Sequence, residues 1–295
     1  MGKSWEDPVH HTFVPRFAIA LAILLLPVIA FSEDEKGPKS VASGRVESKE
    51  ISFEVGDAYA FRGKGFDDDK AIRVALSNSH FHRYFVDRYW DRSYFVNEFF
   101  AKQEDVLVLW LEFSPEGKYR GLSYYFEPGN GCGWCSNGEA TSTVVVKDGR
   151  LIGKVASKED DRSVDVTLDV PIASDDRGQA LGAGGGAPGK VYTAFHEALI
   201  HRDDPALKNL FAAERVERWG EYEKQGDGDA WVNVFLDEHH AQTLHVTEAY
   251  VKGDEALVLV EGEHPSIGKV KGEALLSQEN GSWRVLDETF QIGSW

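Results

Sequence analysis

The sequence is poor in cysteine and basic residues, with two cysteines and 32 Lys and Arg against 49 Asp and Glu in 295 residues. Two cysteines are too few for a fold held together by disulfides. The net charge of −17 excludes nucleic acid as an expected partner, because phosphate binding needs a basic stripe that is missing here. The same charge disfavours electrostatic attachment to an anionic membrane. No pattern calls for a cofactor, and we expect none.

Long hydrophobic runs are also scarce, and the clearest is Phe17–Phe31 near the N-terminus. It is shorter than the about 20 residues of a membrane-spanning helix. Val28-Ile29-Ala30 offers compact residues to a signal peptidase, and Pro27 interrupts the helix just before them. We therefore expect residues 1–30 to be a signal peptide that exports a periplasmic or extracellular protein. The alternative is an uncleaved anchor formed by residues 17–31, which would place the protein at the membrane.

The length and the apolar content predict two folded domains. Hydrophobic residues make up 42% of the chain, which is enough for packed cores and excludes wholesale disorder. Residues 31–45 are small and charged and are predicted to be a flexible lead-in. Residues 174–189 are rich in glycine and are predicted to be a linker. The expected domains are therefore residues 46–173 and residues 190–295.

Alternation of apolar and polar residues dominates the first domain. Ile51, Phe53 and Val55 share one face of a strand, and four alternate residues from Val164 to Val170 do the same. Lys147-Asp-Gly-Arg150 predicts a tight hairpin. Further strands are expected at Val106–Phe113, Leu122–Phe126, Thr141–Val146 and Leu151–Ala156. Many short strands predict a mainly-β sandwich or an open barrel.

One segment of the first domain departs from this alternation, because Phe81–Phe100 holds nine aromatic residues. Their spacing predicts one helix or two short helices inserted against the sheet. Two interpretations follow. The segment is either a cover whose aromatic side chains are buried, or a platform that binds a sugar, a lipid or a partner protein.

The two cysteines lie close together, in Cys132-Gly-Trp-Cys135. Asn and Gly on both sides predict a turn between strands, and export would place the pair in an oxidising compartment, so we expect a disulfide that fixes a loop. A redox pair is the first alternative. A metal site is the second, in which His80 and His82 complete the ligand set, although the separation in sequence makes this a weak candidate.

The second domain begins with helices and ends with strands. Helices are expected at Lys190–His201, at Ala206–Val216 after an Asp203 cap and Pro205, and at about Trp231–His240. The four strands that follow are predicted at Ala241–Val251, Ala256–Glu263, Lys269–Gln278 and Trp283–Ile292. Turns at Lys252-Gly-Asp254 and Glu279-Asn-Gly-Ser282 join them into a meander.

Three helices followed by a curved four-stranded antiparallel sheet resemble the nuclear-transport-factor-like superfamily of α+β cones, which includes SnoaL-like and ketosteroid-isomerase-like proteins. The residues that carry the resemblance are Tyr192, Phe195, Ala198 and Leu199 of the first helix, and the closing Asn280–Leu286 segment. In that superfamily the mouth of the cone holds a ligand or a catalytic pair, while other members bind partners or form dimers. The resemblance thus implies a ligand pocket and allows a homodimer through this half. The first domain resembles β domains of exported bacterial proteins.

Seven residues are candidates to line such a pocket. Tyr192 and His196 lie one helical turn apart and so share a face. The set comprises Tyr192, His196, Trp219, Tyr222, Trp231, Phe235 and His245. His196 with Glu288 is the candidate acid–base pair, because imidazole titrates near neutrality and a carboxylate can orient it.

Three functional hypotheses follow from these patterns. The leading one is an exported, non-catalytic protein that binds a small apolar ligand or a protein partner. The second is a hydrolase, isomerase or dehydratase that uses the His–carboxylate pair. The third is a redox or metal protein that acts through Cys132 and Cys135.

Overall fold

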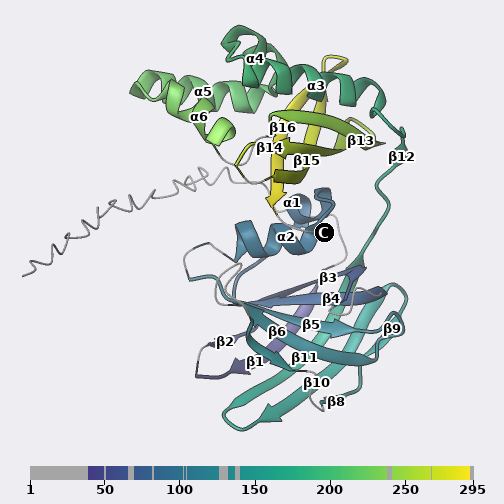
Figure 1. The fold of residues 1–295 in the computed structure, drawn as a ribbon. Helices are drawn as coiled ribbons and strands as arrows, with labels where there is room; N and C mark the ends of the chain where they lie inside the picture. The colour runs from purple at the N-terminus through teal and green to yellow at the C-terminus, as the bar shows by residue number, and fades with distance from the viewer. Residues whose placement is uncertain are drawn as a thin grey trace, which may run out of the picture. The chain divides into compact units, whose positions relative to one another are not determined.

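The computed structural model describes residues 39–292 except 50, 66–69, 82, 102, 104, 126–131, 137–139, 238–240 and 267. The predicted signal peptide, residues 1–30, lies outside the described residues. None of the described helices has the length and the apolar character needed to cross a membrane. The described chain is mainly β-structure, as predicted, and its strands form two sheets (Figure 1).

The N-terminal sheet contains eleven strands and runs in the order β2-β1-β11-β3-β4-β5-β6-β7, with β10 pairing to β11, β8 and β9. The strands are β1 (Val41–Glu47), β2 (Ser52–Glu54), β3 (Asp57–Lys64), β4 (Lys70–Ser77), β5 (Val108–Phe113), β6 (Tyr119–Tyr125), β7 (Cys132–Ser136), β8 (Thr141–Ser142), β9 (Val145–Lys147), β10 (Arg150–Glu159) and β11 (Arg162–Ala173). Ile172 and Ala173, at the end of β11, pair in parallel with β3, whereas the other strand pairs are antiparallel.

This sheet curls around one hydrophobic core. Val46 of β1 and Val166 of the neighbouring β11 belong to the same buried cluster as Leu111 of β5, although β3 and β4 separate β5 from β11 in the sheet. The alternation predicted for Ile51–Val55 and for Val164–Val170 is confirmed, because these apolar residues are buried and their neighbours are more exposed. The predicted hairpin is confirmed too, with positive φ angles of 50° at Asp148 and 72° at Gly149, as its tight turn requires.

Some boundaries in this half were predicted wrongly. Residues 41–45 belong to β1 instead of a flexible lead-in, since they pair with β11. The cysteine segment forms strand β7, which pairs with β6, where a turn was predicted. Strands β3 and β4 were not predicted, because several consecutive residues in each are buried and the alternation is lost.

The aromatic segment forms three short helices, α1 (Arg83–Arg88), α2 (Arg92–Phe95) and the π-helix η1 (Val96–Phe100). Asp91 caps α2, because its Oδ1 accepts a hydrogen bond from the backbone N–H of Tyr94 at 2.9 Å. The segment begins with Phe81, which stacks on Phe100 against the N-terminal sheet. Tyr89, stacked on Phe95, packs instead against the C-terminal sheet.

The same short segment therefore contributes to hydrophobic clusters on both sheets, within one compact unit that extends from Lys39 to Trp295. The interpretation of this segment as a cover is confirmed for Phe81, Tyr89 and Phe100, which are at most 3% exposed. Trp90 differs from them, because it is 48% exposed.

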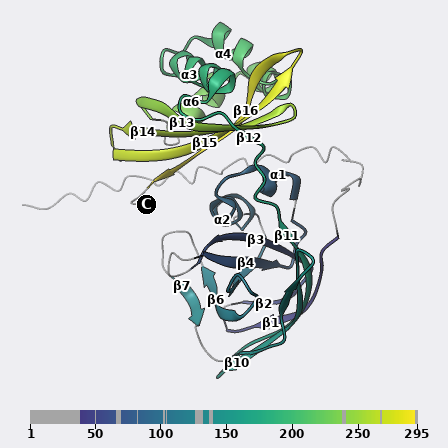
Figure 2. The same ribbon diagram turned by 90° about the vertical axis from the view of Figure 1, so that its right-hand side faces the viewer.

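The C-terminal sheet is an antiparallel meander whose strand order is β12-β13-β14-β15-β16. Its strands are β12 (Gln179–Ala180), β13 (Thr243–Lys252), β14 (Glu255–His264), β15 (Gly268–Glu279) and β16 (Ser282–Ile292). The helices are α3 (Gly186–Ile200), α4 (Asp204–Leu210), α5 (Ala213–Gln225) and α6 (Gly228–Asp237). They cover one face of this sheet in both views (Figures 1 and 2).

The four predicted strands of the meander are confirmed within three residues at each end. The Asp203 cap is also confirmed, as its side chain accepts a hydrogen bond from the N–H of Ala206 at 3.1 Å. The helix predicted at residues 206–216 was wrong, because α4 ends at Leu210 and α5 begins at Ala213. Part of the predicted linker is ordered against the sheet, since β12 pairs with β13 and α3 begins at Gly186.

Candidate functional site

Three of the predicted pocket residues are buried between the helices and the C-terminal sheet. Tyr192 and His196 on α3 and Trp219 on α5 are at most 2% exposed, and Tyr192 and Trp219 belong to the core of this half. The Tyr192 hydroxyl donates a hydrogen bond to Oε2 of Glu288 at 2.5 Å. Burial and the adjacent carboxylate raise the pKa of Tyr192 well above its usual value. The structure thus brings together Tyr192 and Glu288, a pair that the sequence did not suggest.

The other candidates for the pocket are described to different extents. Tyr222 on α5 is half-buried at the edge of the core. Trp231 and Phe235 belong to α6, and their side chains are outside the described set. His245 on β13 has an exposed side chain, and its Nε2 lies 3.8 Å from Oε2 of Glu261.

The cysteine and histidine candidates are only partly described. Cys135 is not a free thiol, but the side chain of Cys132 lies outside the described residues, so the disulfide stays a prediction. His80 is exposed near Asp57, and His82 is outside the described residues. Among the residues that are described, no group of three or more His, Cys, Asp or Glu could hold a metal ion.

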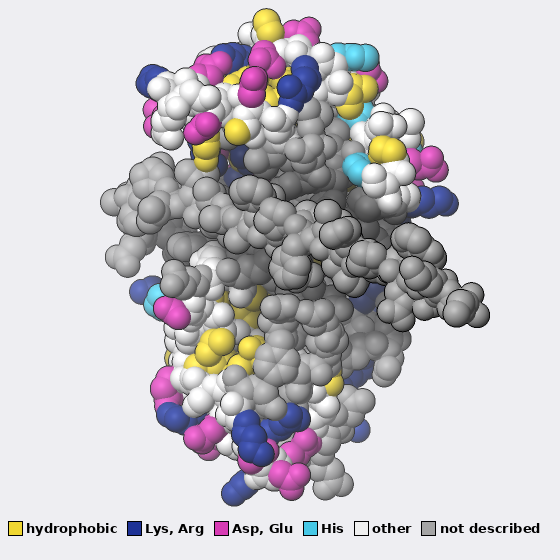
Figure 3. Space-filling view, turned by 60° about the vertical axis from the view of Figure 1, so that its left-hand side comes forward, with side chains coloured by type: hydrophobic (Ala, Val, Ile, Leu, Met, Phe, Trp, Pro, Cys, Tyr) yellow, Lys and Arg dark blue, Asp and Glu magenta, His cyan; other side chains and the backbone are white. Residues whose placement is uncertain are grey.

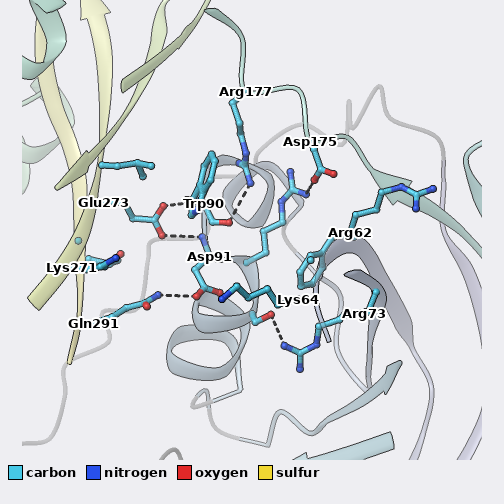
Figure 4. Close-up of a pocket in the computed structure, with 18 of the residues that line it drawn as sticks. Arg62, Lys64, Arg73, Trp90, Asp91, Asp175, Arg177, Lys271, Glu273 and Gln291 are labelled. Atoms are coloured by element: carbon cyan, nitrogen blue, oxygen red, sulfur yellow. Dashed lines mark hydrogen bonds and ion pairs between the residues drawn. The ribbon is translucent and has the colours of Figure 1, made fainter. Parts of the chain in front are cut away.

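A large cleft lies on the other face of the C-terminal sheet, with a volume of about 970 Å³. Its lining comes from β14, β15 and β16 on one side and from β3 and β4 on the other. The start of α2, the connection after β11, Thr247 of β13 and Pro115 also contribute. In Figure 4, Lys271, Glu273 and Gln291 extend from the C-terminal sheet toward the segment that holds Trp90 and Asp91. Its volume is at the upper end of the roughly 300–1,000 Å³ of small-molecule sites.

The charge of the cleft lining is opposite to that of the whole protein. Seven of the described lining residues are basic, namely Arg62, Lys64, Lys70, Arg73, Arg92, Arg177 and Lys271. Four are acidic, namely Asp91, Asp175, Glu261 and Glu273. The described lining therefore carries three more positive than negative groups, in a chain of net charge −17. Asp67–Asp69, between β3 and β4, are outside the described residues and do not enter this balance.

One face of the molecule can be compared with the cleft. In the space-filling view of that face, acidic and basic side chains are interspersed over the described parts (Figure 3). Mixed charge of this kind is usual for a solvated surface. The basic excess in the cleft thus contrasts with the mixed charge of that face.

Glu273 on β15 is the most deeply buried acidic group of the cleft, at 5% exposure. Its carboxylate accepts hydrogen bonds from two backbone N–H groups, that of Trp90 at 2.5 Å and that of Asp91 at 3.5 Å (Figure 4). Burial, together with the negative charge of Asp91, raises its pKa to about 7, although the Trp90 hydrogen bond acts in the opposite direction. Glu273 is therefore poised to change its charge near neutral pH.

Trp90 and Arg177 form one wall of the cleft. The Trp90 ring stacks on Tyr250 with 5.4 Å between ring centroids, and the guanidinium of Arg177 lies 5.7 Å from the centre of the Trp90 ring. Arg177 also donates hydrogen bonds to the carbonyls of Asp87 at 2.7 Å and Trp90 at 3.4 Å. These contacts hold a cation beside an aromatic ring, a combination suited to an anionic ligand with an apolar part.

Nε of Arg92 and Oγ1 of Thr289 are buried polar atoms of the lining for which the described residues provide no hydrogen-bond partner. The two terminal nitrogens of Arg92 are occupied, because they donate to the Ser174 carbonyl at 2.6 Å and to Asp175 at 3.3 Å. Thr289 lies directly across from Glu273 in the sheet. Unsatisfied buried polar atoms are rare in native proteins, so these two atoms are candidates for ligand contacts.

Sequence reasoning missed this cleft, although one local signal was present. In β15 and β16, Lys271 and Glu273 alternate with residues that face the helices, as do Thr289 and Gln291. A strand with apolar residues on one face and charged residues on the other is commonly solvated on the polar face. Contacts of the aromatic segment with this face, such as those of Trp90 with Glu273 and Tyr250, show that the face lines a cleft.

No protein-family model matches the sequence, and no curated protein matches it either. The geometry and charge of the cleft are therefore the basis for a functional assignment.

Proposed function

We propose that this protein binds a small amphiphilic anion in the cleft between the aromatic segment and the C-terminal sheet. The observation that carries the proposal is the charge of the cleft lining. The described lining residues include seven basic and four acidic ones, although the protein as a whole is strongly acidic. An excess of one sign of charge in a cleft attracts ligands of the opposite sign. Trp90, Phe61 and Leu259 supply apolar surface to the same cleft.

This proposal modifies the leading hypothesis from the sequence, which was a non-catalytic protein whose cone domain binds a small apolar ligand or a protein partner. The order of helices and meander supports an α+β cone for residues 186–292, and we retain that relationship as a proposal. The proposed ligand site, however, lies on the face of the sheet opposite the helices, since Tyr192 and Trp219 fill the helix side.

The location of the protein is a separate proposal. We infer that residues 1–30 direct export, which would place the cleft in the periplasm or outside the cell. N-terminal sequencing of protein from the cell envelope or the medium tests this. A mature chain that begins near residue 31 is expected, and a chain that begins at Met1 in the soluble cell interior would contradict it.

Binding can be tested with 1-anilinonaphthalene-8-sulfonate, an aromatic sulfonate whose fluorescence rises in apolar surroundings. The test variant is Lys70→Ala/Lys271→Ala, which removes two exposed cations from opposite walls of the cleft. The matched control is Lys154→Ala/Lys158→Ala, which removes two exposed lysines from β10. Exposed ion pairs contribute roughly 0.2–1 kcal/mol each, so the cleft variant should bind roughly two- to thirtyfold more weakly.

The control should bind like the wild type, and added salt should weaken binding to the wild type and to the control alike. Equal affinity of both double variants would contradict the proposal. Saturable binding should also raise the melting temperature of the wild type, because a ligand that binds the native state stabilises it.

A further inference from the structure

We propose that Glu273 couples anion capture in the cleft to the uptake of a proton. This inference rests on the proposed function, because it concerns how the same cleft responds to pH. Glu273 lies at the contact between β15 and the aromatic segment and also lines the cleft. An anion bound in the cleft would therefore lie close to a buried carboxylate.

The contacts of Glu273 explain why its charge would respond to a ligand. Both of its hydrogen-bond donors are backbone N–H groups, those of Trp90 and Asp91, which carry no formal charge. Among the described residues it forms no ion pair. Burial disfavours the ionised form, and a second negative charge nearby disfavours it further.

The charged and titratable groups around Glu273 come from every element packed near it. On its own strand is Lys271, and on the neighbouring strands are Glu261 of β14 and Asp287 of β16. Asp287 is paired with Arg215 of α5 and accepts a hydrogen bond from Tyr89. The remaining groups come from the aromatic segment and the connection after β11, and are Asp87, Asp91, Arg92, Asp175 and Arg177.

Arg177 opposes the effect of a bound anion, because its positive charge favours ionised Glu273. A ligand anion that pairs with Arg177 would weaken this stabilisation of the ionised carboxylate. The ligand anion would also repel the negative charge of Glu273. Both effects favour protonated Glu273 in the complex. By linkage, a ligand that promotes protonation binds more tightly where the protonated form is populated.

The expected pH dependence follows from the pKa of about 7 in the free protein. Below that pH, Glu273 is already neutral and binding needs no extra proton. Above it, the ligand either takes up a proton on the carboxylate or binds against its negative charge, so the affinity falls. The sulfonate of 1-anilinonaphthalene-8-sulfonate stays ionised throughout, so changes in the probe cannot produce the effect.

The experiment is isothermal titration calorimetry with this probe near pH 7, in two buffers that differ in ionisation enthalpy. We expect an uptake of about 0.3–0.5 proton per bound probe, and about three- to tenfold tighter binding at pH 5.5 than at pH 8.5. Glu273→Gln should bind without proton uptake and with a flattened pH profile. Glu263→Gln is the matched control, since it removes an exposed carboxylate of β14 that does not line the cleft and should keep the uptake.

The outcomes separate this inference from the proposed function. No binding at any pH would overturn both. Binding by the wild type without proton uptake would overturn only the role of Glu273, and this measurement does not depend on whether a variant folds. An unchanged uptake in Glu273→Gln would assign the proton to another group and would also overturn the inference.

Discussion

The carboxylate of Glu273 accepts a hydrogen bond from the backbone N–H of Trp90, at 2.5 Å, across 183 positions of sequence. The bond joins the C-terminal sheet to the junction between α1 and α2. Beside it, Gln291 donates to Asp91 at 3.2 Å and Tyr94 donates to the carbonyl of Phe290 at 2.9 Å. Of these three hydrogen bonds, the one between Glu273 and Trp90 thus depends on a buried carboxyl group whose pKa is about 7.

The first prediction concerns stability as a function of pH. The folded-state pKa of Glu273, about 7, is higher than the ordinary value of 4.5, so the native state holds this proton more tightly than the unfolded state. The resulting stabilisation is present below pH 4.5 and is lost as the pH rises through 7. Glu273→Gln removes this loss, so the change in unfolding free energy between pH 5 and pH 8 should shrink by about 2 kcal/mol.

Chemical denaturation at several pH values measures this change. Glu261→Gln is the control and should retain the wild-type profile above pH 5, because Lys271 lowers the pKa of the exposed Glu261. Parallel profiles for the wild type and Glu273→Gln would refute the prediction.

The second prediction concerns the buried pair of Tyr192 and Glu288. Tyr192→Phe removes a hydroxyl that donates to Glu288 inside the core, and it should lower the free energy of unfolding by about 1–2 kcal/mol. Tyr222→Phe, in the half-buried tyrosine of α5, should change it by less than about 0.5 kcal/mol. Urea denaturation compares the two variants. Equal losses of unfolding free energy would show that the hydrogen bond of Tyr192 does not stabilise the fold more than the hydroxyl of Tyr222 does.

The third prediction uses two glycines that lie in helices. At Gly189, in the first turn of α3, an added Cβ would lie 2.2 Å from the carbonyl oxygen of Gly184. Gly189→Ala should therefore destabilise the protein by about 1–3 kcal/mol. At Gly220, in α5, an added Cβ would meet nothing within 4 Å.

Gly220→Ala should consequently stabilise the protein by about 0.5–1 kcal/mol, because alanine favours the helix more than glycine does. Thermal unfolding of the two variants should move the melting temperature in opposite directions. A shift of the same sign in both would contradict the account of Gly189.

The fourth prediction concerns Cys132 and Cys135. A thiol reagent should find no reactive thiol in the native protein and two thiols per chain after denaturation and reduction. Reduction alone should lower stability by at most about 2 kcal/mol, because the ring closed by the pair is small. Two thiols in the unreduced, denatured protein would disprove the disulfide.

The sequence was most informative where a strand has one buried and one solvated face. Strand β11 follows such alternation from Val164 to Val170. The tight turn between β15 and β16 was equally readable, and Asn280 and Gly281 have the positive φ angles that it needs. In β3, by contrast, Asp57–Phe61 is buried on both faces, so period-two alternation cannot mark the strand. The helix boundary at Phe211 was also hidden, because this residue leaves the helix to bridge Val285.

The candidate site was harder to predict because its parts are distant in sequence. The position of Glu273 opposite Thr289 follows from strand register, which the meander makes accessible to sequence reasoning. The contact of Trp90 and Arg177 with the cleft face of the C-terminal sheet cannot be predicted in this way, because no local pattern specifies which surface a short aromatic segment will contact. The basic residues of the cleft also appear unremarkable one at a time within an acidic chain.

The aromatic segment also sets the smallest fragment of this protein that can be expected to remain soluble when expressed alone. Leu257 and Leu275 of the C-terminal sheet are 6% and 5% exposed, and both pack with Tyr89. A fragment that starts after the glycine-rich region would lose Tyr89 and present these leucines to water, an apolar face that favours aggregation. Division of the chain at the glycine-rich region would therefore leave this face of the C-terminal sheet uncovered, and a fragment that keeps the sheet covered must include the aromatic segment.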